Sequence, residues 1–464
     1  MELIKEKYNF LSSKFLNLTK TKYFNEIYAF TLALISLLGW KYNNNVSMII
    51  MIALAIIVLI LTTDLKYIIP NTIYFIFSIG EGFSNSQMPV HIIVLGGIFV
   101  ITLLFFSIKN GIKLTKMRSL LGLAGLAITN IIPIIWCRNI PAGNEVMYFF
   151  FFGNLGYLIL YIILVNGIKE NSIDMLAVSM SYLIIILAGE CAFKVYELKD
   201  TTDNILSLWY YMGWGLCNEA GIMICVSIPF VFYLMAKQEK ISGIIFQNLK
   251  IIIAVVGILL TTSRGSFLFG YVMIIILYIV LLFISKNGRA YQNLFLIYSL
   301  IILILMVCFK NHIINFIDDL SKYIFNNKLD DNGRKEIWDM AYNHWNKNWL
   351  FKILGPGITC ELQERATATG VQLTPLVFHS TFFQTLASGG IVGIIFLGIH
   401  FIQKYYNAYK IDKLFFVIVG IGYLIVDIYG MIDNTYHMYY YMIPLMVILA
   451  VVDSTISNKK INLN

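Results

Sequence analysis

The sequence has little charge for its length. Only 13% of its 464 residues are Asp, Glu, Lys or Arg, whereas 59% are hydrophobic. An average soluble domain carries about 25% charged residues, so this composition excludes a water-soluble globule. A helix needs about 20 apolar residues to cross the hydrocarbon core of a bilayer, and this chain has many such runs. The sequence therefore predicts an all-α polytopic membrane protein that forms a single integral membrane domain over residues 1–464.

The sequence also lacks the short motifs that hold metal ions or redox centres. Its 6 Cys residues never stand in a Cys-x-x-Cys pair, and no Asp-x-Asp triplet occurs. The Lys-rich segment 1–26 has no short apolar core before a cleavage site, so it is not a signal peptide. We therefore expect no metal and no cofactor, and we interpret segment 1–26 as a cytoplasmic tail.

Apolar runs separated by polar loops predict fourteen membrane-spanning helices. We place them at residues 27–40, 46–62, 65–79, 90–108, 120–136, 147–168, 173–193, 213–235, 245–261, 265–284, 294–309, 380–402, 414–431 and 438–452.

The basic residues predict how these spans are oriented. With the N-terminus inside, the cytoplasmic segments hold 21 of the 34 Lys and Arg residues, and the short outer segments hold 5. Short cytoplasmic loops are enriched in Lys and Arg, so both termini are predicted to be cytoplasmic. The net charge of +8 is then a sign of membrane orientation, and no nucleic-acid partner is expected.

The remaining basic residues fall in one large extracytoplasmic loop, predicted at residues 310–378. Within it, Ile337, Ala341, Trp345 and Trp349 recur at helical spacing, which predicts an amphipathic helix on the membrane or over a cavity. Asp331 or Asn332 is expected to cap its start, and the segment 354–357, Leu-Gly-Pro-Gly, to stop the helix that follows.

Arg264 lies between two apolar runs in the turn Thr262-Ser263-Arg264-Gly265-Ser266. One interpretation is an interfacial Arg whose charge reaches the lipid headgroups. The other is an anion site, because backbone N–H groups, the hydroxyls of Ser263 and Ser266 and a guanidinium would face one ligand.

His379 precedes the twelfth span, where Thr381 and Gln384 have the spacing of a capping box. We expect the positive end of that helix to favour the neutral imidazole, which can accept a proton. A solvated loop His is the simpler alternative.

Arg334 lies at the start of the amphipathic helix, and its position alone predicts a solvated basic residue. Asn218 and Glu219 begin the eighth span. The eighth, tenth and twelfth spans all run inward from the outer face, so Asn218, Arg264 and His379 lie at outer helix N-termini. Three such positive ends around one cavity would favour a polyanion such as a diphosphate.

Several of these motifs occur in the order that one family shows. The turn 262–266, Gly333-Arg334 followed by Trp338, the segment 354–357, and His379 followed by a Gly-rich membrane helix resemble the O-antigen ligase and O-antigen polymerase (Wzy) superfamily of bacterial surface-polysaccharide assembly. The resemblance covers residues 213–402. Ser380 departs from the pattern, because the family usually has Asn there.

The resemblance implies a GT-C-like helical bundle and an inverting, metal-independent glycosyltransferase in the bacterial cytoplasmic membrane, with its active site on the outer side. Arg264 and Arg334 would bind the diphosphate of an undecaprenyl-diphosphate-linked oligosaccharide, and His379 would deprotonate or orient the acceptor hydroxyl. Asn218, Glu219, Ser263 and Ser266 would be further substrate-binding residues. The expected partners are the lipid-linked donor and acceptor, membrane lipids and a chain-length regulator.

Three functions remain open at this point. A polymerase of capsule or O-antigen joins one lipid-linked repeat unit to another, and a ligase transfers the finished glycan to a different acceptor. A flippase of lipid-linked sugars is the third, although inverted repeats and broken helices in both halves would be expected of it.

Overall fold

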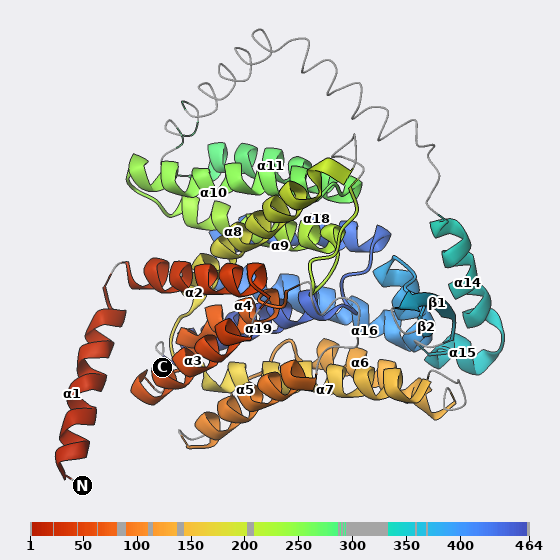
Figure 1. Ribbon diagram of the computed structural model, residues 1–464, viewed down its shortest axis with the longest axis horizontal. Helices are drawn as coiled ribbons and strands as arrows, with labels where there is room; N and C mark the ends of the chain where they lie inside the picture. Colours follow the sequence, from red (N-terminus) through yellow and green to blue (C-terminus); the bar gives the residue numbers. More distant parts are fainter. Residues whose placement is uncertain are drawn as a thin grey trace.

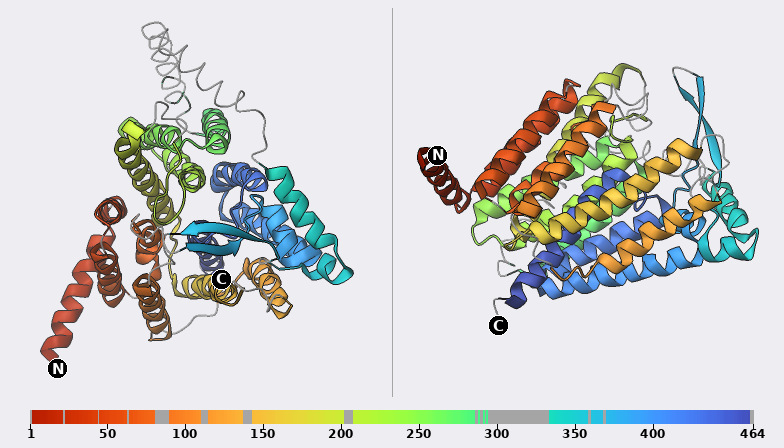
Figure 2. Two further views of the ribbon diagram at one scale, coloured as in Figure 1. Left: turned by 45° about the vertical axis from the view of Figure 1, so that its right-hand side comes forward. Right: turned by 90° about the horizontal axis from the view of Figure 1, so that it is seen from below.

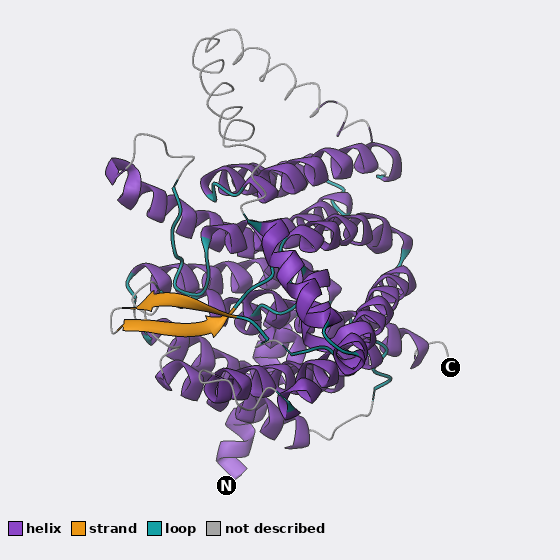
Figure 3. Ribbon diagram, turned by 90° about the vertical axis from the view of Figure 1, so that its right-hand side faces the viewer, coloured by secondary structure: helices purple, strands orange, loops and turns teal. Residues whose placement is uncertain are grey.

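The computed structural model describes residues 2–461 except residues 22, 44, 63, 81–89, 110–114, 137–142, 202–207, 286–287, 289–290, 292, 294–332, 358–359 and 368–369. In the described part the regular structure is helical apart from one β-hairpin (Figure 3). The eleventh predicted span and residues 310–332 of the predicted loop lie outside the described residues.

The helices of the first half of the chain lie at predicted spans, except α1 and η4, which have no predicted counterpart. They are α1 (Glu2–Thr19), α2 (Phe24–Lys41), α3 (Val46–Thr62), η1 (Leu65–Ile68), α4 (Ile69–Phe77), α5 (Val90–Lys109), α6 (Leu120–Ile131), η3 (Ile132–Ile135), α7 (Gly143–Gly167), α8 (Ile173–Leu198), η4 (Lys199–Thr201) and α9 (Cys217–Ala236).

The second half contains the hairpin and the remaining helices. These elements are α10 (Ile241–Leu260), α11 (Arg264–Ile284), α14 (Arg334–Asn346), α15 (Trp349–Leu354), β1 (Leu362–Thr367), β2 (Gly370–Pro375), α16 (Thr381–Ile411), α17 (Lys413–Phe415), η7 (Phe416–Gly420), α18 (Ile421–Ile432) and α19 (Tyr439–Ile461).

Among the described residues, seven helices are long and apolar enough to cross a membrane. They are α8, α9, α10, α11, α16, the run α17 to α18, and α19. Four shorter apolar helices lie at residues 46–62, 94–109, 120–135 and 154–167. The helical fold class is therefore confirmed, and the count of fourteen spans stays a prediction.

The long helices form one bundle with its two ends clearly distinguished (Figures 1 and 2). Both chain termini lie at one end, and α14, α15 and the hairpin lie at the other. The ion pair Lys41–Glu197 joins two segments that the sequence assigns to the outer side. Lys66–Glu170 and Lys237–Asp174 each join segments assigned to the inner side.

Helices α9 and α19 are the centre of the bundle, since 89% of each span is buried, against 33% for α11. Apolar side chains of α9 such as Phe230 and Phe232 are fully buried in the large core. The N-terminal ends of α9, α11 and α16 lie at the same end of the bundle as α14 (Figure 1).

Two local features differ from the prediction, and one element was not predicted. The segment interpreted as a cytoplasmic tail contains the helix α1. The amphipathic loop helix ends at Asn346, and Trp349 begins the separate helix α15, whose N-cap Asn348 accepts a hydrogen bond from the Phe351 N–H. The expected caps Asp331 and Asn332 lie outside the described residues, and the N-cap position of α14 is held by Gly333, with φ 73°. Glycine is the residue that adopts this left-handed conformation without strain.

The segment 354–357 does end α15, as predicted, and it also packs on a break in α16. Gly390 is non-helical inside α16, with φ 60° and ψ −155°. A Cβ on Gly390 would lie 2.5 Å from the backbone N of Gly355, and one on Gly355 would lie 2.7 Å from the N of Gly389. The two backbones touch directly, and this contact joins the segment that follows α15 to the bundle.

Candidate functional site

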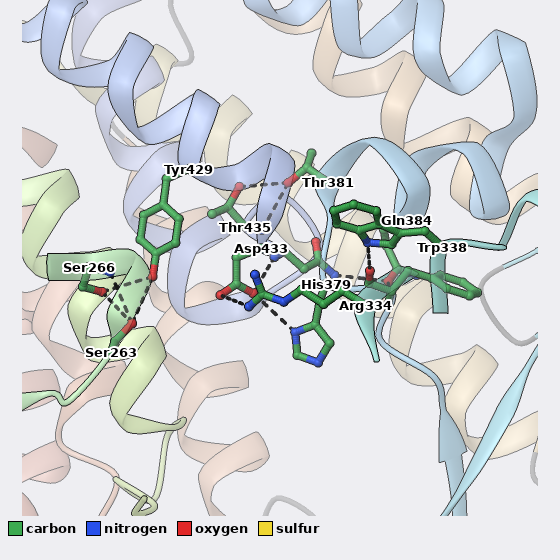
Figure 4. A network of polar contacts seen from close by, with 12 residues as sticks. Ser263, Ser266, Arg334, Trp338, His379, Thr381, Gln384, Tyr429, Asp433 and Thr435 are labelled. Atoms are coloured by element: carbon green, nitrogen blue, oxygen red, sulfur yellow. Dashed lines mark hydrogen bonds and ion pairs between the residues drawn. The ribbon is translucent and has the colours of Figure 1, made fainter. Parts of the chain in front are cut away.

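Asp433 is the residue on which two of the predicted site residues converge (Figure 4). Its Oδ1 lies 3.5 Å from Nδ1 of His379, and its Oδ2 lies 3.9 Å from Nη2 of Arg334. The Asp433 side chain is 14% exposed, whereas those of Arg334 and His379 are 29% and 46% exposed. The Asp433 carboxylate is thus more buried than the Arg334 guanidinium and the His379 imidazole, both of which reach the surface.

His379 is held in a strained backbone conformation. Its φ is 47°, in the left-handed region, where a non-glycine residue costs on the order of 1–3 kcal/mol. Its neighbours Phe378 and Ser380 are buried, and the Ser380 side chain caps α16 by accepting from the Phe383 N–H. Between these two buried neighbours, the His379 side chain stays 46% exposed, and its Nδ1 lies 3.5 Å from Asp433 Oδ1.

Arg334 reaches this place because α14 is docked on the start of α16. Trp338 Nε1–H donates to the carbonyl of Phe378 at 2.9 Å, and its ring stacks on Phe383 with centroids 5.2 Å apart. Ala341 and Phe378 are fully buried in the small cluster beneath. Trp338 lies one helical turn after Arg334, so the docking of Trp338 also positions Arg334.

The serine turn before α11 contacts the helix that ends at Asp433. Ser263 is the N-cap of α11, and its Oγ accepts from the Ser266 N–H. The Tyr429 hydroxyl lies 3.2 Å from Ser263 Oγ and 3.1 Å from Ser266 Oγ. A Cβ at Gly265 would lie 2.6 Å from the Tyr429 ring, so glycine there permits the approach.

Tyr429 and Asp433 are one turn apart in α18, and the Asp433 N–H donates to the Tyr429 carbonyl at 3.0 Å. The end of α18 therefore joins the serine turn, with Arg264 as the first residue of α11, to the pair of Arg334 and His379 (Figure 4). Arg264 is half-buried at this helix start.

The start of α9 packs beside the same turn. A Cβ on Gly221 would lie 2.0 Å from Ser266 Oγ. Glu219 accepts a hydrogen bond from the Leu216 N–H at 2.7 Å, so its carboxylate caps its own helix. Asn218 is half-buried at the first turn of α9. The N-termini of α9, α11 and α16 therefore gather around the end of α18, as the predicted span order requires.

The predicted capping box at Thr381 and Gln384 was wrong by one residue, because Ser380 is the N-cap. Thr381 instead bonds to the 433–435 turn: its N–H donates to the Asp433 carbonyl, and its hydroxyl lies 3.1 Å from that of Thr435. Gln384 Oε1 accepts from the Phe378 N–H and from the Asn434 side chain. These bonds fix the backbone on both sides of the His379–Asp433 contact.

His437 lies four residues beyond Asp433, outside the predicted spans. It is half-buried beside a small cavity between α6, α7 and α19, and its Nε2 lies 3.2 Å from the Thr385 hydroxyl. The scarcity of water around it lowers its pKa from 6.5 to about 4. It is therefore neutral at neutral pH.

The arrangement can bind an anion beside a proton acceptor. The guanidinium of Arg334 and the N-terminal ends of α11 and α16 offer positive charge, and His379 can take a proton. Within the described ranges, no group of three His, Cys, Asp or Glu side chains converges as metal ligands would.

Sequence reasoning did not assign Asp433 and Tyr429 to the site. In the sequence, Asp433 follows the thirteenth predicted span, and a charge so close to a membrane-spanning helix needs a partner. The partners Arg334 and His379 come from 99 and 54 residues away in the chain, so spacing could not reveal them.

Residues 249–398, about a third of the chain, match the family model described as O-Antigen ligase (Wzy_C). The match includes Arg264, Arg334 and His379, and it confirms the resemblance to the O-antigen ligase and polymerase superfamily. A comparison with curated proteins finds no match.

Proposed function

We propose that this membrane protein of the O-antigen ligase and polymerase superfamily is a polysaccharide polymerase. It would join repeat units carried on undecaprenyl diphosphate at the outer face of the bacterial cytoplasmic membrane, in a GT-C-like bundle. The observation that carries the proposal is the convergence of Arg334 and His379 on Asp433, at the end of the bundle where three helix N-termini meet.

The diphosphate of the donor would bind between Arg264 and Arg334. A guanidinium presents parallel N–H donors that match two phosphate oxygens, and the Ser263, Ser266 turn adds a helix N-terminus. The loose 3.9 Å contact between Arg334 and Asp433 supports this role, because a guanidinium so weakly engaged can turn toward a ligand.

The acceptor hydroxyl oxygen would attack the anomeric carbon of the donor sugar from the face opposite to the diphosphate. A new glycosidic C–O bond forms, the bond from the anomeric carbon to the phosphate oxygen breaks, and undecaprenyl diphosphate leaves with the electron pair. With Nδ1 of His379 directed at Asp433, its Nε2 would take the hydroxyl proton. The leaving diphosphate gains charge, which the two arginines stabilise without a metal ion.

A ligase is the second candidate, and the description of the matching family favours it. The two functions share the donor, the diphosphate site and the proton acceptor, and differ only in the acceptor molecule. The flippase alternative receives no support from the family match.

The decisive experiment offers the purified protein one substrate, a synthetic repeat unit on undecaprenyl diphosphate. A polymerase yields a ladder of longer lipid-linked products. If no longer products form, but glycan appears on an added lipid A core or protein acceptor, the protein is a ligase. Ligand-dependent flipping in vesicles without any transfer would exclude both.

His379→Ala tests the chemistry in the same assay. General-base assistance contributes about 10²–10⁴ in rate, so the ladder should be lost by that factor while donor binding remains. His344→Ala is the matched control, because His344 also lies on the outer helices but contacts Glu361. Equal activity of the two variants would reject the role of His379.

A further inference from the structure

The N-terminal helix α1 is attached to the bundle at the end opposite to the site. The Tyr8 hydroxyl donates to the Ile60 carbonyl at 2.8 Å, and the Ser12 hydroxyl donates to the Leu61 carbonyl at 2.7 Å. These are among the last four carbonyls of α3, which lack partners within their own helix. Near the other end of α1, Tyr67 donates to the Thr19 hydroxyl at 3.1 Å. The helix is thus fixed in place.

Its direction is that of a helix lying on a membrane surface. In Figures 1 and 2, α1 runs across the direction of α2 at the end of the bundle where both termini lie. The long helices have the length and apolar composition to cross a bilayer, and a helix that runs across them at this end would then lie along the interface.

The contact with α3 leaves a groove between the two helices. Leu11, Lys14, Phe15 and Leu18 of α1 face Ile57, Ile60 and Leu61 of α3 around a groove of about 430 Å³. Leu11 and Leu18 are 57% and 52% exposed, and Ile57 is 50% exposed. Large apolar side chains so open to the surroundings would be unfavourable in water but suit acyl chains.

The charge that lines the groove is positive, and the acidic residues of α1, Glu2 and Glu6, are not among the lining residues. Lys14 is the charged side chain among the lining residues, and its Nζ lies 4.4 Å from the centroid of the Phe10 ring. No Asp or Glu occurs from Tyr8 to Tyr23, and α3 carries no charge at all. An ammonium group at the edge of an apolar groove matches a phosphate attached to acyl chains.

We propose that the groove between α1 and α3 binds an anionic phospholipid, with its acyl chains against Leu11, Leu18 and Ile57 and its phosphate beside Lys14. The site is separate from the transferase site, so the inference does not depend on the proposed activity. We expect an anionic lipid to bind more tightly than a zwitterionic one. Its headgroup carries a second negative charge or lacks a choline cation, and either difference strengthens the attraction to Lys14.

The test measures lipid retained on the purified full-length protein by mass spectrometry of intact protein–lipid complexes. Phosphatidylglycerol and phosphatidylcholine with the same acyl chains are offered in equal amount. The wild type should retain phosphatidylglycerol in preference, and Lys14→Gln should reduce that preference about five-fold, the effect of one Lys near an anionic lipid surface. Lys20→Gln is the matched control, because Lys20 is exposed after the end of α1 and does not line the groove.

A second variant, Ile57→Trp, fills the groove at a half-exposed position and should lower retention of both lipids. Gel filtration and the unfolding temperature show that each variant is folded. Equal retention of the two lipids by the wild type overturns the proposal, as does an unchanged preference in Lys14→Gln. Dimerisation through this face, with no retained lipid, would assign the groove to a second copy and also overturn it.

Discussion

Asp433 Oδ1 lies 3.5 Å from His379 Nδ1, and the other carboxylate oxygen lies 3.9 Å from the guanidinium of Arg334. One carboxylate at the end of α18 thus faces a residue at the start of α16 and a residue of the loop helix α14.

Asp433→Asn preserves the shape of this side chain and removes its charge. We expect kcat to fall about 10-fold or more with little change in KM, because the imidazole loses the partner that orients it and stabilises its protonated form. Asp174→Asn is the control, since Asp174 pairs with Lys237 at the opposite end of the bundle. A variant of Asp433 with normal kcat would show that the carboxylate is structural only.

Arg264→Lys and Arg334→Lys keep the positive charge and remove the fork of N–H donors. If both arginines bind the diphosphate in bidentate fashion, each variant should lose about 10- to 100-fold in kcat/KM, the value of a charged hydrogen bond. Lys335→Gln, which removes a charge next to Arg334, should change activity much less. Full activity in either Lys variant would argue against bidentate binding at that position.

The predicted orientation can be measured in intact cells, starting from a chain with its 6 Cys residues replaced by Ser. Asp330→Cys should react with an impermeant thiol reagent, because residues 310–378 are predicted to be extracytoplasmic. Lys113→Cys should react only after the membrane is opened. The reverse pattern would invert the topology and place the proposed site in the cytoplasm.

Gly355→Ala and Gly390→Ala test the backbone contact between the end of α15 and α16. Both residues have positive φ, and each new Cβ would lie less than 3 Å from backbone atoms. We expect each change to cost about 2–5 kcal/mol of stability, from strain and overpacking together. Gly398→Ala, on the same helix with no heavy atom within 4 Å of the added Cβ, should be neutral or stabilising by up to about 1 kcal/mol. Equal unfolding temperatures for all three would contradict the contact.

The stability of the folded protein should fall in acid because of His437. Its pKa is about 4 in the folded chain and 6.5 when unfolded, so the unfolded chain binds the proton first as pH falls. Stability is unaffected above pH 6.5 and decreases between pH 6.5 and 4. The loss is at most about 3 kcal/mol, and smaller to the extent that cavity water solvates the imidazolium. His437→Gln should show a shallower decrease in unfolding temperature across this window, and an identical decrease would refute the assignment.

Runs of apolar residues located most of the helices. The side chains of a span face either other helices or lipid, so they are apolar over a length that the thickness of the bilayer sets. Helix α3 begins and ends at the predicted residues 46 and 62. The hairpin β1 to β2 was not predicted, and neither was the helix in the N-terminal tail. Their sequences are polar or mixed, so no membrane constraint marks them.

Three residues of the candidate site could be predicted from their type and their position along a single helix. Arg264, Arg334 and His379 stood out because each adjoins a helix start or a special turn. The role of Asp433 depends on packing between α14, α16 and α18, which is tertiary information. The positive φ at His379 was also invisible, since it arises from the burial of Phe378 and Ser380 on either side.

The docking of α14 through Trp338 has a consequence for turnover. His379, Asp433 and Ser263 stand at the ends of predicted spans, whereas Arg334 stands on a helix outside them. That helix is docked by the Trp338 hydrogen bond to the Phe378 carbonyl, by the ring stack of Trp338 on Phe383 and by the small apolar cluster around Ala341. Lifting α14 would remove the Arg334 cation and the Trp338 hydrogen bond beside His379, while Asp433 and Ser263 would keep their places at the ends of α18 and α11. A diphosphate held by two arginines would then lose one of its two guanidinium contacts in a single movement. Undecaprenyl diphosphate could leave and the next donor could enter without any repacking of the membrane-spanning helices.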